Sequence, residues 1–171
     1  WRKLMKKKVL SILVDNTSGV LSRISGLFSR RGYNIDSLTV GETENPKYSR
    51  MTVVVRGDDH ILDQIEKQLA KLIDVKEIVE LPHDESVCRE LVLITVGVQA
   101  SNRPEIIAIA DTFRGKIVDV GVDTMMIELT GNQTKLNAFI KLLDGYEIKE
   151  LVRTGIAGLS RGAEVMLDEF D

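Results

Sequence analysis

The sequence predicts an α+β protein that is built from two tandem βαββαβ units. Two observations lead to this prediction. Apolar, β-branched runs alternate with segments whose apolar residues recur at helical spacing. The order strand, helix, strand, strand, helix, strand then occurs twice along the 171 residues, on either side of a polar stretch at 82–86.

The first unit is expected over residues 6–81 and opens with a buried strand over 9–14. The turn 15–19, Asp-Asn-Thr-Ser-Gly, contains only residues that favour turns or helix caps. A helix should follow and end at Gly32, because glycine readily takes the left-handed conformation found at helix ends. The apolar face of this helix carries Val20, Leu21, Ile24, Leu27 and Phe28.

The rest of the first unit is expected to be a strand pair, a helix and a last strand. The strands 33–40 and 48–56 flank a polar hairpin loop. Asp58 and Asp59 suit the start of the second helix, where negative charge is favourable. Asp63 and Lys67 lie four residues apart on its outer face. A strand over 75–81 completes the unit.

The second unit is expected over residues 87–162, after a linker at 82–86. Its strands should cover 89–98, 116–122, 123–130 and 146–152. One helix opens at Pro104, at its first position, and is ended by Gly115, and the other lies within 131–143. The Gly-rich segment 153–162 is too irregular to assign, and the acidic tail 163–171 is expected to fray. Both units therefore have the split arrangement called ferredoxin-like.

Composition excludes several classes of protein. Hydrophobic residues make up 43% and charged residues 29%, as in ordinary globular proteins. A net charge of −3 offers no electrostatic basis for binding nucleic acid, and no apolar run is long enough to span a membrane. The single cysteine, Cys88, excludes an internal disulfide and fits a reducing, cytoplasmic location. Because the sequence begins with Trp1, we expect its natural start to differ.

The turn 15–19 is the best candidate for a ligand site. A helix start has free N–H groups that attract an anion such as a carboxylate, and Gly19 allows close approach to the backbone. Asn16 offers both a donor and an acceptor beside this helix start. We call the opening formed by the turn 15–19 at the helix start the mouth. The alternative is that Asn16 and Ser18 merely cap the helix, and the periodicity alone does not decide between the two.

No catalytic set is apparent in the sequence. His60 and His83 stand alone, and the carboxylates fall on helix faces and in turns, where we expect them to be solvated. A small ferredoxin-fold hydrolase, such as an acylphosphatase, would need Arg and Asn residues around a phosphate loop, and no such loop is present. We therefore expect no catalysis and no metal site in this chain.

Specific motifs resemble a known family. The pattern D-N-x-x-G-V-L, followed by a helix and R-G-Y-N-I-x-S-L, resembles an ACT domain, a small amino-acid-sensing regulatory fold. More narrowly, GLFSRRGYNIDSLTV followed by SRMT is similar to the regulatory small subunit of acetohydroxyacid synthase, also called acetolactate synthase. The late segment RTGIAGLSRG extends the resemblance, which covers about Lys7 to Gly162.

The resemblance implies a site and partners. ACT pairs commonly join at an edge strand, so a homodimer would complete the site with residues from both chains. The effector, valine or a related branched-chain amino acid, would inhibit a separate catalytic subunit that this chain otherwise activates. Thiamine diphosphate, Mg²⁺ and FAD would belong to that catalytic subunit, and none to this chain. The effector residues would be Asn16, Gly19, Val20, Leu21, Asn34 and Ile35.

Two further expectations follow. The second unit lacks the Asn-x-x-Gly mouth, and Pro104 removes an N–H donor there, so we place no equivalent site in it. The competing interpretation is a free-standing amino-acid-binding module that controls transcription. Neither a helix-turn-helix nor a basic face supports that interpretation, and a pull-down with the catalytic subunit would separate the two.

Overall fold

The computed structural model describes residues 5–162, and the chain divides into two compact units. The first unit contains the described residues up to Val87 together with the segment that begins at Ile156, and the second unit is Cys88–Gly155. The chain therefore leaves the first unit and returns to it. Within the described residues, no helix is long and apolar enough to cross a membrane.

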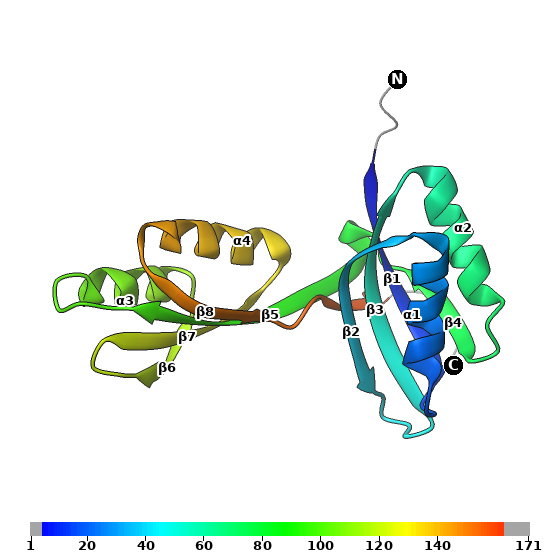
Figure 1. The fold of residues 1–171 in the computed structure, drawn as a ribbon, viewed down its shortest axis with the longest axis horizontal. Coiled ribbons are helices and arrows are strands. Elements are labelled where there is room, and N and C mark those ends of the chain that lie inside the picture. The colour runs from blue at the N-terminus through cyan, green and yellow to red at the C-terminus, as the bar shows by residue number, and fades with distance from the viewer. Residues whose placement is uncertain (1–4, 163–171) are drawn as a thin grey trace. The chain divides into compact units, whose positions relative to one another are not determined.

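The first unit is a four-stranded antiparallel sheet with two helices on one face, as Figure 1 shows. The strands lie in the order β2-β3-β1-β4, which confirms the predicted βαββαβ fold. The elements are β1 (Lys6–Asp15), α1 (Val20–Arg31), β2 (Asn34–Glu42), β3 (Tyr48–Gly57), α2 (Asp59–Ala70) and β4 (Val75–Glu80).

Alternation along the strands explains how this sheet buries a core. Leu10, Ile12 and Val14 point towards the helices, while Ser11 points to the opposite face. The side chains that meet these strands come from one stripe of each helix and include Ile24, Leu27, Phe28, Leu62, Ile65 and Leu69. Burying an aliphatic side chain contributes about 1.5–3 kcal/mol before entropy is counted. The apolar stripe read from the sequence is therefore the core.

The helix ends of the first unit follow the sequence signals. The carboxylate of Asp58 accepts a hydrogen bond from the N–H of Ile61 at 2.9 Å and caps α2. Gly32 ends α1 with a φ of 64°, in the left-handed region. The expected pair of Asp63 and Lys67 is present on the outer face of α2, with 2.8 Å between the charged atoms.

A short strand covers the other face of the first sheet, and the sequence did not reveal it. β9 (Ala157–Ser160) follows Ile156, whose backbone N–H and C=O bond to the hydroxyls of Ser37 and Thr39 at 2.8 and 2.9 Å. The N–H of Gly158 donates to Thr52 Oγ1 at 3.3 Å. These long-range contacts with hydroxyl groups explain why the segment from Ile156 groups with the first unit, whereas the sequence was expected to place it in the domain 87–162.

The connection between the units also differs from the expected linker. Residues 83–85 form a short 3₁₀ helix, η1 (His83–Glu85), and β5 (Ser86–Gly97) begins at once. Its first residues, Ser86 and Val87, belong to the first unit, and β9 pairs with β5. Within the first unit, the N–H of Arg161 also donates to the carbonyl of Glu85 at 2.8 Å.

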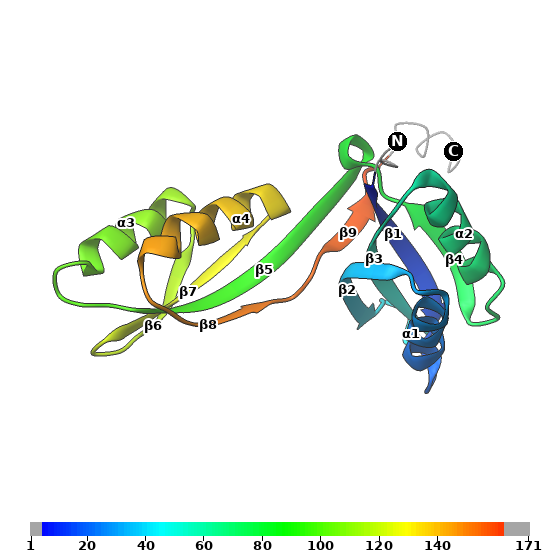
Figure 2. The same cartoon turned by 45° about the horizontal axis from the view of Figure 1, so that its top comes forward.

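The second unit repeats the architecture of the first, as the helices α3 and α4 over their sheet show in Figure 2. Its strands lie in the order β6-β7-β5-β8. Phe113 and Phe139 meet edge to face in its core, with ring centroids 5.4 Å apart. The remaining elements are α3 (Arg103–Thr112), β6 (Lys116–Val120), β7 (Thr124–Gly131), α4 (Gln133–Leu142), η2 (Leu143–Gly145) and β8 (Ile148–Arg153).

Details at the ends of α3 correct two expectations. Pro104 is the second residue of the helix, one position later than predicted. The left-handed residue after the helix is Arg114, with a φ of 59°, and not Gly115. Gly115 instead allows close packing, because a Cβ there would lie 3.3 Å from the carbonyl oxygens of Ala110 and Glu128.

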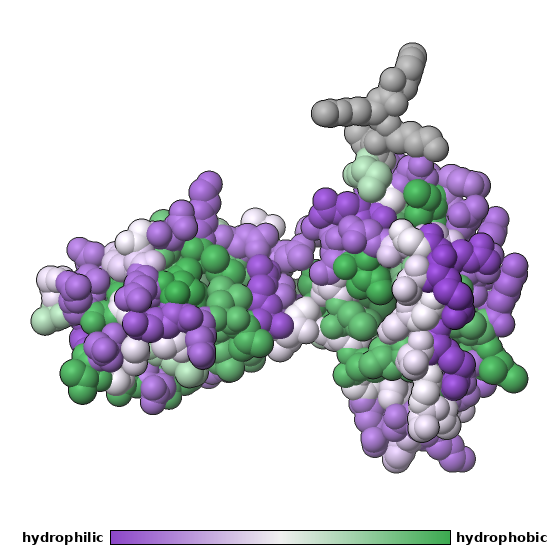
Figure 3. Space-filling model, viewed as in Figure 1, coloured by the Kyte–Doolittle hydropathy of each residue, from purple (hydrophilic) through white to green (hydrophobic). Residues whose placement is uncertain are grey.

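The uncovered face of the second sheet is partly apolar. Figure 3 shows apolar surface gathered on this unit, and Val152 of β8, which pairs in register with Leu93, is 57% exposed. A depression of about 370 Å³ on this face is lined by Leu93, Thr95, Met126, Glu150, Leu151 and Val152. The two units thus differ, since β9 covers this face in the first.

Candidate functional site

The turn between β1 and α1 leaves the start of α1 open. Gly19 is the N-cap residue with a φ of 86°, and no side chain caps the helix. The alternative that Asn16 and Ser18 only cap the helix is therefore wrong. The first intrahelical bond runs from the N–H of Arg23 to the carbonyl of Gly19 at 3.0 Å, so the N–H groups before it point into the mouth.

Asn16 joins this turn to the hairpin loop between β2 and β3. Its backbone N–H donates to the carbonyl of Lys47 at 2.8 Å. Its side-chain Nδ2 donates to the carbonyl of Pro46 at 3.0 Å and reaches Oε2 of Glu42 at 3.4 Å. Among the described residues, Oδ1 of Asn16 has no hydrogen-bond partner, so this atom remains available as an acceptor.

The two apolar residues of the first turn differ in accessibility. Leu21 is 43% exposed and presents an apolar edge beside the mouth. Val20 is 4% exposed because its side chain packs in the core. Val20 is among the expected effector residues, but because its side chain is buried it can contribute only its backbone N–H.

Arg23 and Asp74 form a forked ion pair beside Gly19, and the sequence did not indicate this pair. Nε and Nη2 of Arg23 donate to the two carboxylate oxygens of Asp74 at 2.6 and 3.0 Å. These hydrogen bonds lower the pKa of the Asp74 carboxyl below its ordinary value. Asp74 is 7% exposed, so the expectation that the carboxylates are solvated is wrong here. Its carbonyl accepts from the N–H of Asp15 at 2.9 Å.

The second unit contains a similar buried pair. Glu90 is 6% exposed, and both of its carboxylate oxygens accept hydrogen bonds from Arg153 at 2.9 Å. A paired carboxylate can be buried because the guanidinium compensates its charge. Among the described residues, no group of three or more His, Cys, Asp and Glu side chains is placed to hold a metal ion.

Within one chain, the two groups of predicted site residues lie far apart. Asn34 pairs in register with Arg56, which pairs with Lys7 at the start of β1. Asn16 instead follows Asp15, at the opposite end of that strand. Nine residue-to-residue steps separate Lys7 from Asn16, which is about 30 Å at the usual rise. A single chain therefore does not bring Asn34 and Ile35 to Asn16 and Gly19.

The corresponding mouth of the second unit is closed. The side-chain oxygen of Asn102 accepts from the N–H of Gln99 at 2.7 Å, and the N–H of Arg103 bonds the carbonyl of Gln99 at 3.0 Å. A polar pocket of about 350 Å³ lies at this end, lined in part by Gly97, Asp123 and Lys149. The start of α3 nevertheless differs from that of α1, because hydrogen bonds within the turn 99–103 already use its polar groups.

Known families match both halves of the chain. Residues 89–162 match the model described as the small subunit of acetolactate synthase. Residues 10–77 match the AHAS small subunit-like ACT domain. Together these matches cover most of both units and include the turn 15–19.

Whole proteins and one solved structure are also similar to this chain. A probable acetolactate synthase small subunit of Methanothermobacter thermautotrophicus is 48% identical over 92% of this chain and 95% of its own. The acetolactate synthase small subunit of Mycolicibacterium smegmatis is 50% identical over 90% of each chain. The crystal structure of the acetolactate synthase small subunit from Thermotoga maritima superposes with a TM-score of 0.86, at 41% identity over 92% of this chain and 99% of that one.

Proposed function

The chain belongs to the family of acetolactate synthase small subunits, and we propose that a branched-chain amino acid, valine or a close relative, regulates the catalytic subunit by binding at the mouth of α1. The small subunit is the regulatory subunit of this enzyme and not the catalytic one. The observation that carries the proposed site is the uncapped start of α1 at Gly19, inside the matched ACT domain.

The mouth has groups that suit both charged ends of an amino acid. Backbone N–H groups at Gly19, Val20 and Leu21 would hold the carboxylate. The free Oδ1 of Asn16 would accept from the ammonium group, and the exposed edge of Leu21 would contact a branched side chain. These roles support an amino acid over a purely apolar or purely anionic ligand.

A homodimer would complete the site through β2. This strand is at the edge of the first sheet, so one row of its backbone groups is free to pair with another chain. The opposite edge strand, β4, is shorter and more densely charged, with Lys76, Glu77 and Glu80 among its six residues, whereas β2 has Asp36 and Glu42 among nine, and edge charges discourage such pairing. β2 is therefore the edge that we assign to the dimer.

The required register follows from the positions of the two half-sites. Two copies of β2 related by a two-fold axis pair antiparallel. If Leu38 lies next to its own copy, Asn34 of the partner subunit lies opposite Glu42. Glu42 contacts Asn16 at 3.4 Å, so this register brings the two half-sites together. The proposed site then contains Asn16, Gly19, Val20 and Leu21 from one chain and Asn34 and Ile35 from the other.

Activity measurements with the catalytic subunit test the proposal. The purified chain alone should form no acetolactate from pyruvate, and it should raise the activity of its cognate catalytic subunit. L-valine, L-leucine and L-isoleucine are then titrated, and at least one should inhibit the complex. Turnover by the isolated chain, or a catalytic subunit that responds neither to the chain nor to these amino acids, would contradict the proposal.

A further inference from the structure

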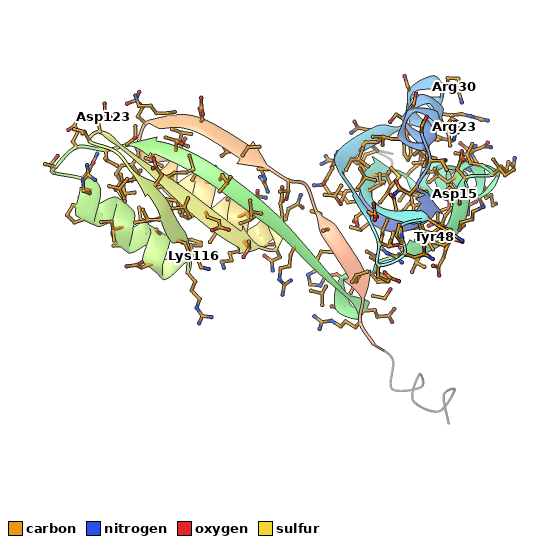
Figure 4. All side chains as sticks on the ribbon, turned by 90° about the horizontal axis from the view of Figure 1, so that it is seen from below. Asp15, Arg23, Arg30, Tyr48, Lys116 and Asp123 are labelled. Atoms are coloured by element: carbon orange, nitrogen blue, oxygen red, sulfur yellow. The ribbon has the colours of Figure 1, made fainter. Side chains whose placement is uncertain are left out.

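Arg23 lies over the mouth because of helix geometry. Side chains in a helix tilt towards its N-terminus, so a residue covers the position four residues before it. A Cβ built at Gly19 would lie 2.9 Å from Nη1 of Arg23. The end of the guanidinium therefore crosses directly over the α-carbon of the N-cap residue. Arg23 and Arg30 both project from α1 in Figure 4.

The ion pair with Asp74 leaves one amino group of Arg23 unused. Nε and Nη2 donate to Asp74, which holds the guanidinium plane in a fixed direction. Nη1, the group nearest to Gly19, has no hydrogen-bond partner among the described residues. Its two N–H donors are thus held at the helix start without an acceptor from residues 5–162.

The charge of Arg23 is unusual for its place in a helix. Cations near a helix N-terminus are unfavourable, and acidic residues are preferred. The other helices of the described chain follow this preference, or use a cap: α2 has Asp58 and Asp59, α3 has Glu105, and α4 has Asn132. Only α1 among these four has neither a capping side chain nor an acidic residue in its first turn.

We propose that Arg23 is a recognition residue of the effector site, where its Nη1 donates to the carboxylate of the bound amino acid while Asp74 fixes its orientation. This inference rests on the proposed function and adds a residue that is outside the effector residues expected from the sequence. The carboxylate is then held by the first-turn N–H groups on one side and by Nη1 on the other. A neutral amide in place of the carboxylate loses the charge-assisted bond.

Calorimetry on the full chain tests this role. Removing Arg23 alone would leave Asp74 buried and unpaired, so the test variant is the double substitution Arg23→Gln, Asp74→Asn. The single variant Asp74→Asn keeps the guanidinium. The matched control is Arg30→Gln, because Arg30 covers Gly26 in the same way, with Nη1 3.2 Å from a built Cβ, but lies away from the mouth. Each protein is titrated with L-valine, L-leucine and L-isoleucine and with the corresponding amino acid amides.

The natural chain should bind the amino acid in preference to its amide. The double variant should lose affinity for the amino acid by about tenfold or more and should lose most of this preference. Asp74→Asn, which keeps the guanidinium but loses the carboxylate that orients it, should weaken binding less than the double variant and should keep the preference. Arg30→Gln should stay within about threefold and keep the preference. A folded double variant that retains both affinity and preference would overturn the role of Arg23 but would leave the proposed function standing. If the natural chain binds none of the three amino acids, the proposed function fails as well.

Discussion

Nε of Arg23 donates to Oδ2 of Asp74 at 2.6 Å, and this contact joins the first turn of α1 to the loop that precedes β4. The two residues are 51 positions apart in the sequence. Because the carbonyl of Asp74 also accepts from the N–H of Asp15, the pair connects both sides of the mouth at Gly19. Its loss should therefore affect stability as well as binding.

The ion pair should make stability depend on pH in the acid range. The pKa of Asp74 is lowered by its hydrogen bonds with Arg23, so the folded state favours the ionised carboxylate. The resulting stabilisation is fully present above the unfolded pKa of about 3.9 and is lost as the pH falls through the lower folded value. The Tm difference between the natural chain and Asp74→Asn should be constant from about pH 7 to 5 and shrink below about pH 4.

Asp84 provides the control for this measurement, because its side chain is 97% exposed. Asp84→Asn should leave the Tm nearly unchanged over the same range, since exposed charges contribute little. A Tm difference for Asp74→Asn that grows on acidification would contradict the assigned sign.

Substitution of Gly19 by aspartate should abolish feedback inhibition and leave activation largely intact. An aspartate there would place its own carboxylate between Arg23 and the helix start, where the effector carboxylate should bind. The φ of 86° adds moderate strain, which aspartate tolerates better than most residues. A loss of a few kcal/mol in binding would weaken affinity about a hundredfold.

Gly26→Asp is the matched control, because Gly26 lies on the same helix under Arg30. Both variants are assayed with the catalytic subunit across a valine titration. Valine inhibition should persist in the Gly26→Asp complex. If it persists undiminished with Gly19→Asp, the mouth of α1 is not the effector site.

Pairing through β2 predicts a homodimer that one charge can weaken. In the proposed register, Val40, which is 47% exposed, lies near Asp36 of the partner subunit. Val40→Asp therefore places like charges opposite one another twice per dimer and should raise the dimer dissociation constant by about tenfold or more. Sedimentation equilibrium measures this constant.

Val118 serves as the control, because it is 49% exposed and lies on β6 of the second unit. Val118→Asp should leave dimerisation unchanged if pairing occurs through β2. A natural chain that is monomeric at micromolar concentration, with and without valine, would rule out the proposed dimer.

The anchoring of β9 predicts that Ile156 stabilises the first unit. Ile156 is 5% exposed, and Ile156→Ala should cost about 2–5 kcal/mol through lost burial and a residual cavity. Hydrogen exchange should become faster in β2 and β3, with little change in α3 and α4. Leu159→Ala, at a position that is 59% exposed, should change stability by less than about 0.5 kcal/mol. Faster exchange confined to the second unit would contradict the assignment of this segment.

Local signals in the sequence were sufficient for the repeated fold. The apolar stripe through Ile24 and Phe28, the cap at Asp58 and the stop at Gly32 all depend on neighbours within one or two helical turns. These features appear as periodicity and residue type, so they could be predicted. The turn at Gly19 could be predicted in the same way, but its lack of a cap could not, because only the structure excluded capping by Asn16 and Ser18.

The features that the sequence did not reveal depend on distant partners. The carbonyl of Ile156 accepts a hydrogen bond from the hydroxyl of Thr39, which is 117 residues away in the sequence. The segment around Ile156 also has weak strand propensity because it contains Gly155 and Gly158. The partnership of Arg23 with Asp74 similarly has no local pattern. Single-sequence periodicity reports which face of an element is apolar, but it does not report which hydroxyl or carboxylate meets that face.

The return of the chain at Ile156 has a consequence for synthesis on the ribosome. The first unit receives its last strand only after the whole of Cys88–Gly155 has been translated. At about 5–20 residues per second, the nascent sheet waits several seconds before the segment that contacts Thr52 is available. A chain truncated within the second unit would therefore also lack the segment that covers the sheet of the first unit. Both units of such a chain should be susceptible to proteolysis.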